Sequence, residues 1–349
     1  MVGAKPFCLH PQSNSLNLCH GRLVPDTFFR LMRRFLFFLF LSLCGAVICS
    51  AEPPLTLPSE TEKILKDIYS ARIDQAVNEA QQLQQQMPNH PLGYILEAEA
   101  LWWKIWCSSA EFKYGMTLPR HREKIASDQH YFDISTKALA IAEARLKEHE
   151  SAEMYFYAGM AEAASSRLYG LRWEYRNTAR AGVHARDNFV RALALDPQLA
   201  DADFGLGLYD YYVDTLSTMA RVMRFFMGIP GGTKEEGMQL LDRSIRSGQL
   251  TSALSRFYLA INLHNYDQRY EEALFVLTPL VENYPDNPLF WLAQGDLFGK
   301  LGRKAQALQA YKKAEATTAK VSDPAMHQKI SLLLQQSIAA LSGPGSTKP

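Results

Sequence analysis

The sequence predicts an all-α protein built from repeated pairs of helices. One observation is an internal period of 34 residues that relates two adjacent segments near the C-terminus. The positions that match across this period are Ala273 with Ala307, Leu277 with Tyr311, and Leu280 with Ala314. A second observation is that small and aromatic residues recur at helical spacing inside each segment. No strand-like alternation of apolar and polar residues is evident, so we expect helices throughout residues 59–341.

Residues 287–318 show how one unit is built. The side chains expected on the facing stripes of its two helices are Trp291, Gly295 and Phe298, then Ala307, Tyr311 and Ala314. Gly302 lies between the two helices and permits a tight turn. Small residues let two helices approach closely, and aromatic side chains fill the remaining gaps. The pattern resembles the tetratricopeptide repeat (TPR), and this resemblance implies a right-handed superhelix of stacked hairpins.

The same signature recurs upstream with wider spacing. Centres of first helices are expected at Ala98, Gly159, Gly207, Ile261 and Gly295. Intervals longer than one period predict three insertions between paired helices, at roughly 105–128, 167–181 and 213–232. We therefore expect about six hairpins with inserted helices. A cap helix at 323–341 should follow them, because the last face of such a stack has no neighbour.

The first 51 residues have the layout of a secretory signal peptide. Arg33 and Arg34 precede the short apolar stretch 35–43, and small residues follow at 49–51. Met32 is the start that this layout favours. We expect an exported protein of the periplasm or cell envelope. Two alternatives would tether it to a membrane: retention of the segment as an anchor, or lipidation at Cys44 or Cys49.

These features divide the chain into four parts. They are a signal peptide region at 1–51, a linker at 52–58, a TPR-like α-solenoid domain at 59–341 and a disordered tail at 342–349. Removal of the first part would leave Cys107 as the only cysteine, so neither an intrachain disulfide nor a cysteine-based metal site is expected.

Charge and motifs argue against several classes of function. Lys+Arg 37 against Asp+Glu 36 gives a net charge of +1, which does not suit a nucleic-acid-binding protein. The H-E-x-x-H and G-x-S-x-G patterns are absent from the sequence, and no cofactor is expected. The Gly-rich segment 228–234 has Thr before Lys, unlike a phosphate-binding loop, so we interpret it as a turn with Thr233 capping the next helix.

Two charged patterns have both a functional and a structural interpretation. Asp203, Asp210 and Asp214 share one face of a predicted helix and could form a carboxylate site for acid–base chemistry or a cation. Alternatively, they accept hydrogen bonds from backbone amides or pair with arginines. Arg172, Arg176 and Arg180 would align on one helix face, where they could bind an anion or simply be solvated. We favour the structural interpretation of both patterns.

The TPR resemblance implies that the first helices line a concave groove. Carried over to this sequence, it places ten side chains on that groove as candidate partner-binding residues: Trp102, Trp103, Phe156, Met160, Phe204, Leu208, Tyr211, Tyr212, Tyr258 and Leu292. Aromatic side chains are good anchors for a peptide because they combine a large apolar area with a polar tip. The insertions at 105–128 and 213–232 are themselves apolar, so they could fill this groove from inside.

Residues 204–241 also show a loose resemblance to the tetratricopeptide repeat protein 39 family, in a glycine-containing helix, an aliphatic insert and a Gly-rich turn. The expected function is that of a non-enzymatic scaffold that binds another protein in the cell envelope. The alternative is a periplasmic accessory protein that binds a small molecule or lipid, for example for a transporter. An enzyme built on Asp203, Asp210 and Asp214 is a third hypothesis.

Overall fold

The computed structural model describes residues 55–342 apart from short internal gaps, at 114–115, 120–122, 218–219, 222–223 and 225–227. All described residues belong to one compact unit, Glu52–Pro349. The expectations for the signal peptide region 1–51 and for residues 343–349 of the tail lie outside the described residues. Within the expected linker, Leu55 is buried in the core.

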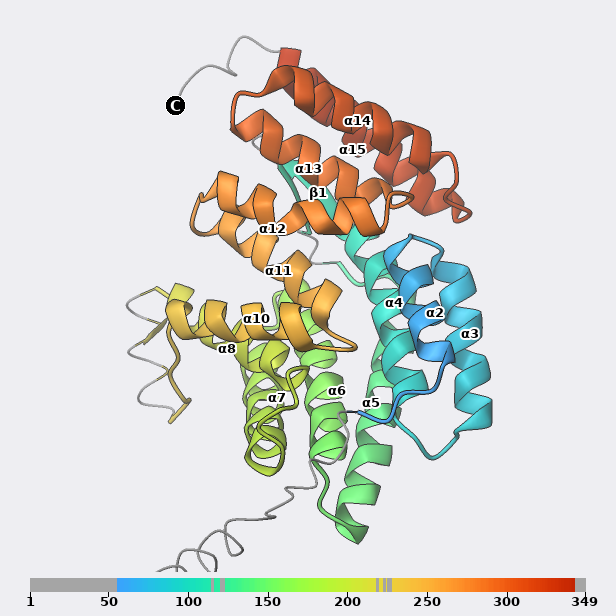
Figure 1. Ribbon diagram of the computed structural model, residues 1–349, viewed down its shortest axis with the longest axis vertical. Helices are drawn as coiled ribbons and strands as arrows, with labels where there is room; N and C mark the ends of the chain where they lie inside the picture. The colour runs from blue at the N-terminus through green and yellow to red at the C-terminus, as the bar shows by residue number, and fades with distance from the viewer. Residues whose placement is uncertain are drawn as a thin grey trace, which may run out of the picture. The chain divides into compact units, whose positions relative to one another are not determined.

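The described residues form repeating helical hairpins, which confirms the all-α fold class. The first helices of the six pairs are α2 (Glu60–Tyr69), α4 (Leu92–Ser109), α6 (Ala152–Leu171), α8 (Ala202–Thr215), α11 (Ser252–Asn265) and α13 (Pro288–Lys300). Their partners are α3 (Ile73–Gln86), α5 (Ala126–Glu148), α7 (Tyr175–Leu195), α10 (Lys234–Ser247), α12 (Tyr270–Asn283) and α14 (Lys304–Thr318). A final helix, α15 (Pro324–Ser342), follows where a cap was expected. Each helix packs on the next helix in chain order (Figure 1).

Small residues bring the paired helices close together. A Cβ atom at Gly295 would lie 2.3 Å from the Tyr311 ring, so no larger residue fits there without displacing α14. The Phe189 ring of α7 lies between two glycines of its neighbours. A Cβ atom at Gly159 would come within 2.7 Å of this ring, and one at Gly205 within 1.8 Å. The glycines and aromatic residues that indicated the repeat therefore set the spacing between helices.

The turn inside a hairpin repeats as well. Ala71, Trp173 and Gly302 each follow a first helix with a positive φ, at 61°, 63° and 71°. After each of them, the next backbone N–H donates to the carbonyl five residues earlier, at 2.8–2.9 Å. This is the pattern of the Schellman motif, which ends helices through one residue in the left-handed region. Gln268 has the same kind of φ, 56°, in the turn between α11 and α12.

Two of the expected insertions differ from prediction. The segment 105–128 contains a two-stranded antiparallel hairpin, β1 (Ala110–Lys113) and β2 (Met116–Pro119), where only helix was expected. Four residues per strand are too few for the alternation to stand out in the sequence. At 167–181 there is no insertion, because α6 and α7 absorb the extra residues as 20 and 21 helical positions. The helices from α8 to α14 have only 13–15 residues each. The third, at 213–232, falls between α8 and α10 and lies partly outside the described residues.

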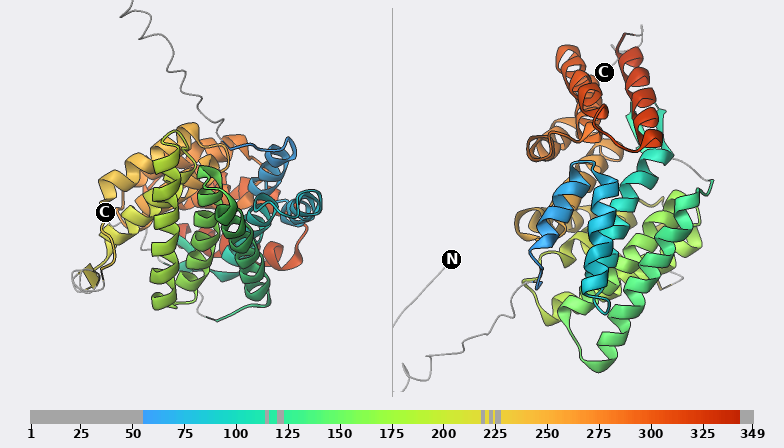
Figure 2. Two further views of the ribbon diagram at one scale, coloured as in Figure 1. Left: turned by 90° about the horizontal axis from the view of Figure 1, so that it is seen from below. Right: turned by 90° about the vertical axis from the view of Figure 1, so that its right-hand side faces the viewer.

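The two ends of the described chain lie against each other. Helix α15 packs on α4 and β1 as well as on α13 and α14, and β2 packs on α13 (Figure 2). Lys104 on α4 forms an ion pair with Asp323, with Nζ and Oδ2 2.5 Å apart. The Asn287 side chain donates to the Tyr69 carbonyl at 2.9 Å and so joins the start of α13 to the end of α2. The stack of hairpins therefore closes on itself.

Aromatic side chains fill the space that this closure encloses. The Trp103 ring centroid lies 4.7 Å from that of Phe257, 5.6 Å from Phe290 and 6.1 Å from Tyr69. These four residues come from α4, α11, α13 and α2, and all are buried. First helices that are distant in the sequence therefore share one core. Among the described residues, none of the helices combines the length and the apolar character that a membrane span needs.

The left-handed turn residues lead to a first prediction. Gln268→Gly should raise the free energy of unfolding by about 0.5–1 kcal/mol, because glycine adopts φ 56° without the cost that a Cβ atom adds. The reverse change, Gly302→Ala, should lower it by about 1 kcal/mol. A Cβ atom at Gly302 would meet no atom within 4 Å, so backbone strain alone accounts for the loss. Urea denaturation of both variants measures the effects, and a destabilised Gln268→Gly protein would contradict this interpretation of the turns.

Candidate functional site

The expected groove residues lie in the core. Eight of the ten are buried, with exposed fractions of 9% or less: Trp102, Trp103, Phe156, Met160, Phe204, Leu208, Tyr211 and Leu292. Tyr212 and Tyr258 are partly buried and pack against the same core. Of the two outcomes that the sequence left open, an open groove and a filled one, the burial of these side chains corresponds to the filled one. For Trp103 the physical reason is the closure of the stack, which brings α4 against α11 and α13.

The structure brings the expected residues together in separate groups. Trp102, Trp103 and Tyr258 lie around the buried ion pair of Glu99 and Arg167: Trp103 lies beside Glu99, and Trp102 and Tyr258 lie beside Arg167. Phe204 joins them through Tyr258, with ring centroids 5.9 Å apart. The other members pack elsewhere: Phe156 against Phe189, Tyr211 and Tyr212 against Tyr266, and Leu292 in the wall of a small cavity.

The ion pair joins Glu99 on α4 to Arg167 on α6. Their Oε2 and Nη1 atoms are 2.9 Å apart, and the side chains are only 7% and 13% exposed. The guanidinium of Arg167 also donates to the Tyr131 hydroxyl at 3.2 Å and lies over the Trp102 ring, 4.8 Å from its centroid. Burial raises the pKa of Glu99, and the nearby charge of Arg167 opposes that rise. The pair therefore neutralises two charges between α4 and α6.

Sequence reasoning missed Glu99 and Arg167. Each stands in an apolar helical stretch, LEAEALWW in one case and AEAASSRLYGL in the other. A charge among buried positions needs a partner, which is the signal that could have found them. The partner could not be identified, because the pairing depends on how α4 and α6 stack.

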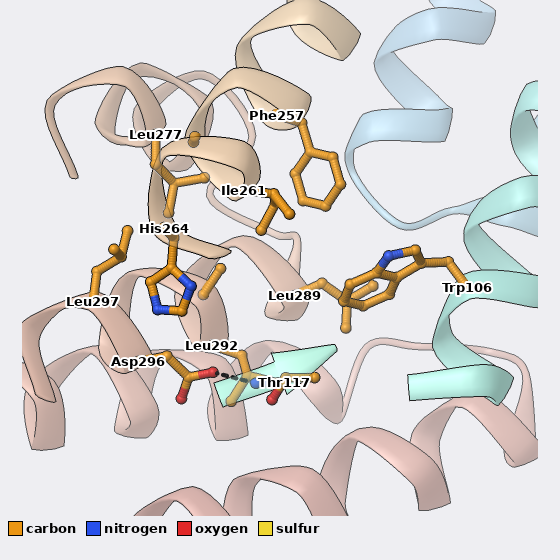
Figure 3. A pocket seen from close by; sticks show the side chains of 12 residues that line it. Trp106, Thr117, Phe257, Ile261, His264, Leu277, Leu289, Leu292, Asp296 and Leu297 are labelled. Carbon is orange, nitrogen blue, oxygen red and sulfur yellow. Dashed lines mark hydrogen bonds between the residues drawn. The ribbon is translucent and has the colours of Figure 1, made fainter. Parts of the chain in front are cut away.

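A second polar cluster borders a cavity of about 20 Å³ at the junction of β2, α11 and α13 (Figure 3). Its walls are mostly apolar, with Trp106 and Phe257 the largest side chains. Thr117, His264 and Asp296 supply its polar groups, each from a different element (Figure 3). The volume admits about one water molecule.

Asp296 joins three segments through its carboxylate. It accepts hydrogen bonds from the Tyr311 hydroxyl at 2.8 Å, the Ser337 hydroxyl at 3.1 Å and the Thr117 backbone N–H at 3.1 Å. These donors belong to α14, α15 and β2, so one carboxylate holds the hairpin and the cap helix to α13. Burial raises the pKa of Asp296 to about 6, and the three hydrogen bonds limit the rise.

His264 faces the same cavity but has a different environment. Its Nδ1 lies 2.8 Å from the Asn265 side-chain oxygen, and its Nε2 is buried with no hydrogen-bond partner among the described residues. Burial lowers the pKa of His264, so the imidazole is neutral at pH 7. A neutral imidazole and a carboxylate in an enclosed, water-sized cavity have no room for an organic substrate beside them.

The charged patterns noted in the sequence have structural roles. Asp203 forms a bidentate ion pair with Arg243. Asp214 accepts a hydrogen bond from the Lys234 backbone N–H at 3.1 Å. Burial raises the pKa of Asp210 to about 6, because Gly232 packs directly over this carboxylate. The three aspartates therefore do not converge on a common site. Among the residues that the structure describes, no group of three or more His, Cys, Asp or Glu side chains could hold a metal ion.

The Gly-rich turn fits its structural interpretation, whereas the predicted arginine stripe is wrong. Thr233 caps α10 as expected, since its hydroxyl accepts from the Glu236 N–H at 3.2 Å. The arginine stripe does not form, because Arg172 ends α6 while Arg176 and Arg180 lie on α7. Arg172 is instead buried and binds both carboxylate oxygens of Asp128 at 2.7 Å.

In comparisons with known proteins, no protein-family model and no curated protein matches the chain.

The raised pKa of Asp296 predicts a pH-dependent stability. The folded state favours the protonated form of Asp296. Its contribution to stability is therefore fully present when the pH is below the ordinary pKa of 3.8, and it is lost as the pH rises through the folded-state pKa of about 6. Asp296→Asn should remove the loss, and its stability relative to the natural protein should rise by about 2–3 kcal/mol between pH 4 and pH 7. Denaturation at several pH values measures this difference. Asp133→Asn, exposed on α5, is the control, and parallel pH profiles for Asp296→Asn and the natural protein would contradict the expectation.

The buried ion pair gives another prediction. Glu99→Gln leaves the guanidinium of Arg167 without a counter-charge and should lower the free energy of unfolding by about 3–5 kcal/mol. Replacing both residues by methionine should lower it much less, because no unpaired charge is then buried. Chemical denaturation of the single and double variants tests this coupling, and equal losses in both would refute it.

Proposed function

We propose that this chain is a TPR-like α-solenoid, a right-handed superhelix, that acts as a non-enzymatic scaffold and binds another protein. Six helical hairpins and a final cap helix support the fold assignment. So do the glycine–aromatic contacts between paired helices and the shared left-handed turn. Stacked hairpins of this kind present extended surfaces for docking rather than a catalytic pocket.

The observation that carries the proposal is an exposed apolar surface on the outside of a chain whose interior is already filled. Phe275 on α12 is 81% exposed, although most large apolar side chains of the described residues are buried. Phe275 borders an open groove with other apolar side chains, and a contiguous apolar surface is typical of a site that binds a partner. The partner therefore docks on the outer helices and not on the ten residues first expected to bind it.

The alternative function, an accessory protein that binds a small molecule or a lipid, has less support. The enclosed cavity beside Asp296 holds about 20 Å³, whereas ligand pockets hold several hundred. Native mass spectrometry of the purified protein distinguishes the two functions: a co-purified small molecule would favour the alternative.

We further propose that the protein is exported to the cell envelope and that residues 1–51 are its signal peptide. The layout of Arg33–Arg34, the apolar stretch 35–43 and the small residues at 49–51 supports this. Mass spectrometry of the protein from its native cells should find an N-terminus at Glu52. An intact N-terminus, or a protein recovered only from the cytosol, would contradict export.

Capture from native cells tests the scaffold function. The tagged chain is expressed at its natural level, crosslinked in the cell and purified from the envelope. We expect one protein partner at a stoichiometric amount. The matched control lacks residues 1–51 and stays in the cytosol, so it should not recover that partner. Equal recovery with both chains, or no partner with either, would overturn the proposal.

A further inference from the structure

The outer face of the stack has a groove between two second helices. Helices α10 and α12 form its sides, and α11 forms its floor with Leu259 and Leu263. Met238, Phe275 and Val276 complete the apolar lining. The groove has a volume of about 370 Å³ and is open to solvent, unlike the small cavity beside Asp296.

Phe275 is the most exposed large apolar side chain among the described residues, at 81%. The floor residues Leu259 and Leu263 are buried by contrast, at 7% and 3%. An isolated exposed apolar residue is ordinary on a protein surface. Here the exposed ring stands beside a continuous apolar groove, so that a partner could bury both together.

Most of the charged residues that line the groove are acidic, and each of them is paired with an arginine. Its charged residues are Asp242, Glu271, Glu272 and Arg269, a balance of three acids to one base. The Arg269 Nε–H donates to the Glu272 carboxylate at 2.7 Å, so the charge of Arg269 is neutralised locally. An Nη1–H of the same guanidinium donates to the Met238 sulfur at 3.4 Å. Asp242 and Glu271 pair with Arg246 and Arg303, which do not line the groove. Pairs this exposed are weak, so basic groups of a partner can compete for both carboxylates.

We propose that this groove binds an amphipathic helix of the partner protein, with apolar residues on one face and Lys or Arg on its flanks. This inference rests on the proposed function and names the surface and the partner chemistry. An open groove covers too little of a small molecule to hold it, since ligand pockets bury most of their ligand. A helix can lay two apolar side chains, one turn apart, against the α11 floor and Phe275. Its basic flanks then meet Asp242 and Glu271.

Two labelled peptides test the proposal with the purified full chain. Each is about 18 residues long, roughly five helical turns, with Leu at positions i, i+3, i+4 and i+7. One carries Lys and the other Glu at the remaining positions. Fluorescence anisotropy should show the Lys peptide binding, with an affinity at least about tenfold higher than that of the Glu peptide. Phe275→Ala should weaken binding of the Lys peptide by about tenfold or more, as for a central interface residue.

The control variant is Leu332→Ala, because Leu332 is 46% exposed on α15 and does not line the groove. It should bind the Lys peptide like the natural protein. The double variant Asp242→Lys, Glu271→Lys should reverse the preference and favour the Glu peptide. Circular dichroism should show the same helix content for all variants, because each of these side chains is exposed.

Several results would overturn the groove as the docking site. The first is that Phe275→Ala leaves the affinity for the Lys peptide unchanged. The second is that both peptides bind with equal affinity, and the third is that neither peptide binds. Light scattering that shows a dimer lost in Phe275→Ala would assign the groove to a second copy of the chain instead. Capture from native cells separates this inference from the proposed function. If the natural chain and Phe275→Ala recover the same partner, the groove is not the docking site but the scaffold function is supported. If neither recovers a partner, the scaffold function is wrong.

Discussion

The contact of Trp103 with Phe257 and Phe290 determines the rest of the architecture. These rings join α4 to α11 and α13, which lie far apart in the chain, and the Trp103 side chain is only 2% exposed. Burial of each aromatic side chain contributes about 1.5–3 kcal/mol, and each ring pair adds about 0.5–1.5 kcal/mol. A stack that contacted only its neighbours in chain order would leave this apolar area in water. Closure removes this apolar area from water and makes it part of the core.

The filled interior explains where charges lie and where a partner can bind. Glu99 and Arg167 neutralise each other in the interior, and Asp296 accepts three hydrogen bonds where the β-hairpin and the cap helix meet α13. These polar groups join elements that are separate in the sequence. Large apolar surface remains accessible on the outer helices, at the groove beside Phe275. The proposed binding surface therefore lies on the outer face, and the buried polar groups lie in the interior.

The sequence allowed local features to be predicted better than distant contacts. The pair α13 and α14 followed from the glycine, alanine and aromatic spacing in 287–318, because adjacent helices make those contacts. Trp103 was placed on a concave groove that could be open or filled, because its contacts with Phe257 and Phe290 depend on closure of the whole stack. The strands at 110–119 were missed because they are short. The role of Arg172 was missed because an unforeseen turn at Trp173 separates it from Arg176.

Hydrogen exchange of a Trp103→Leu variant tests the closed interior most directly. If the stack closes through this ring, weakened packing at Trp103 should reduce amide protection in α11 and α13 as well as in α4. Mass spectrometry of peptides from each helix resolves these regions, and the natural protein provides the reference. We expect comparable loss in all three helices. Loss confined to α3, α4 and α5, the neighbours in chain order, would show that the hairpins stack without closing and would contradict the account.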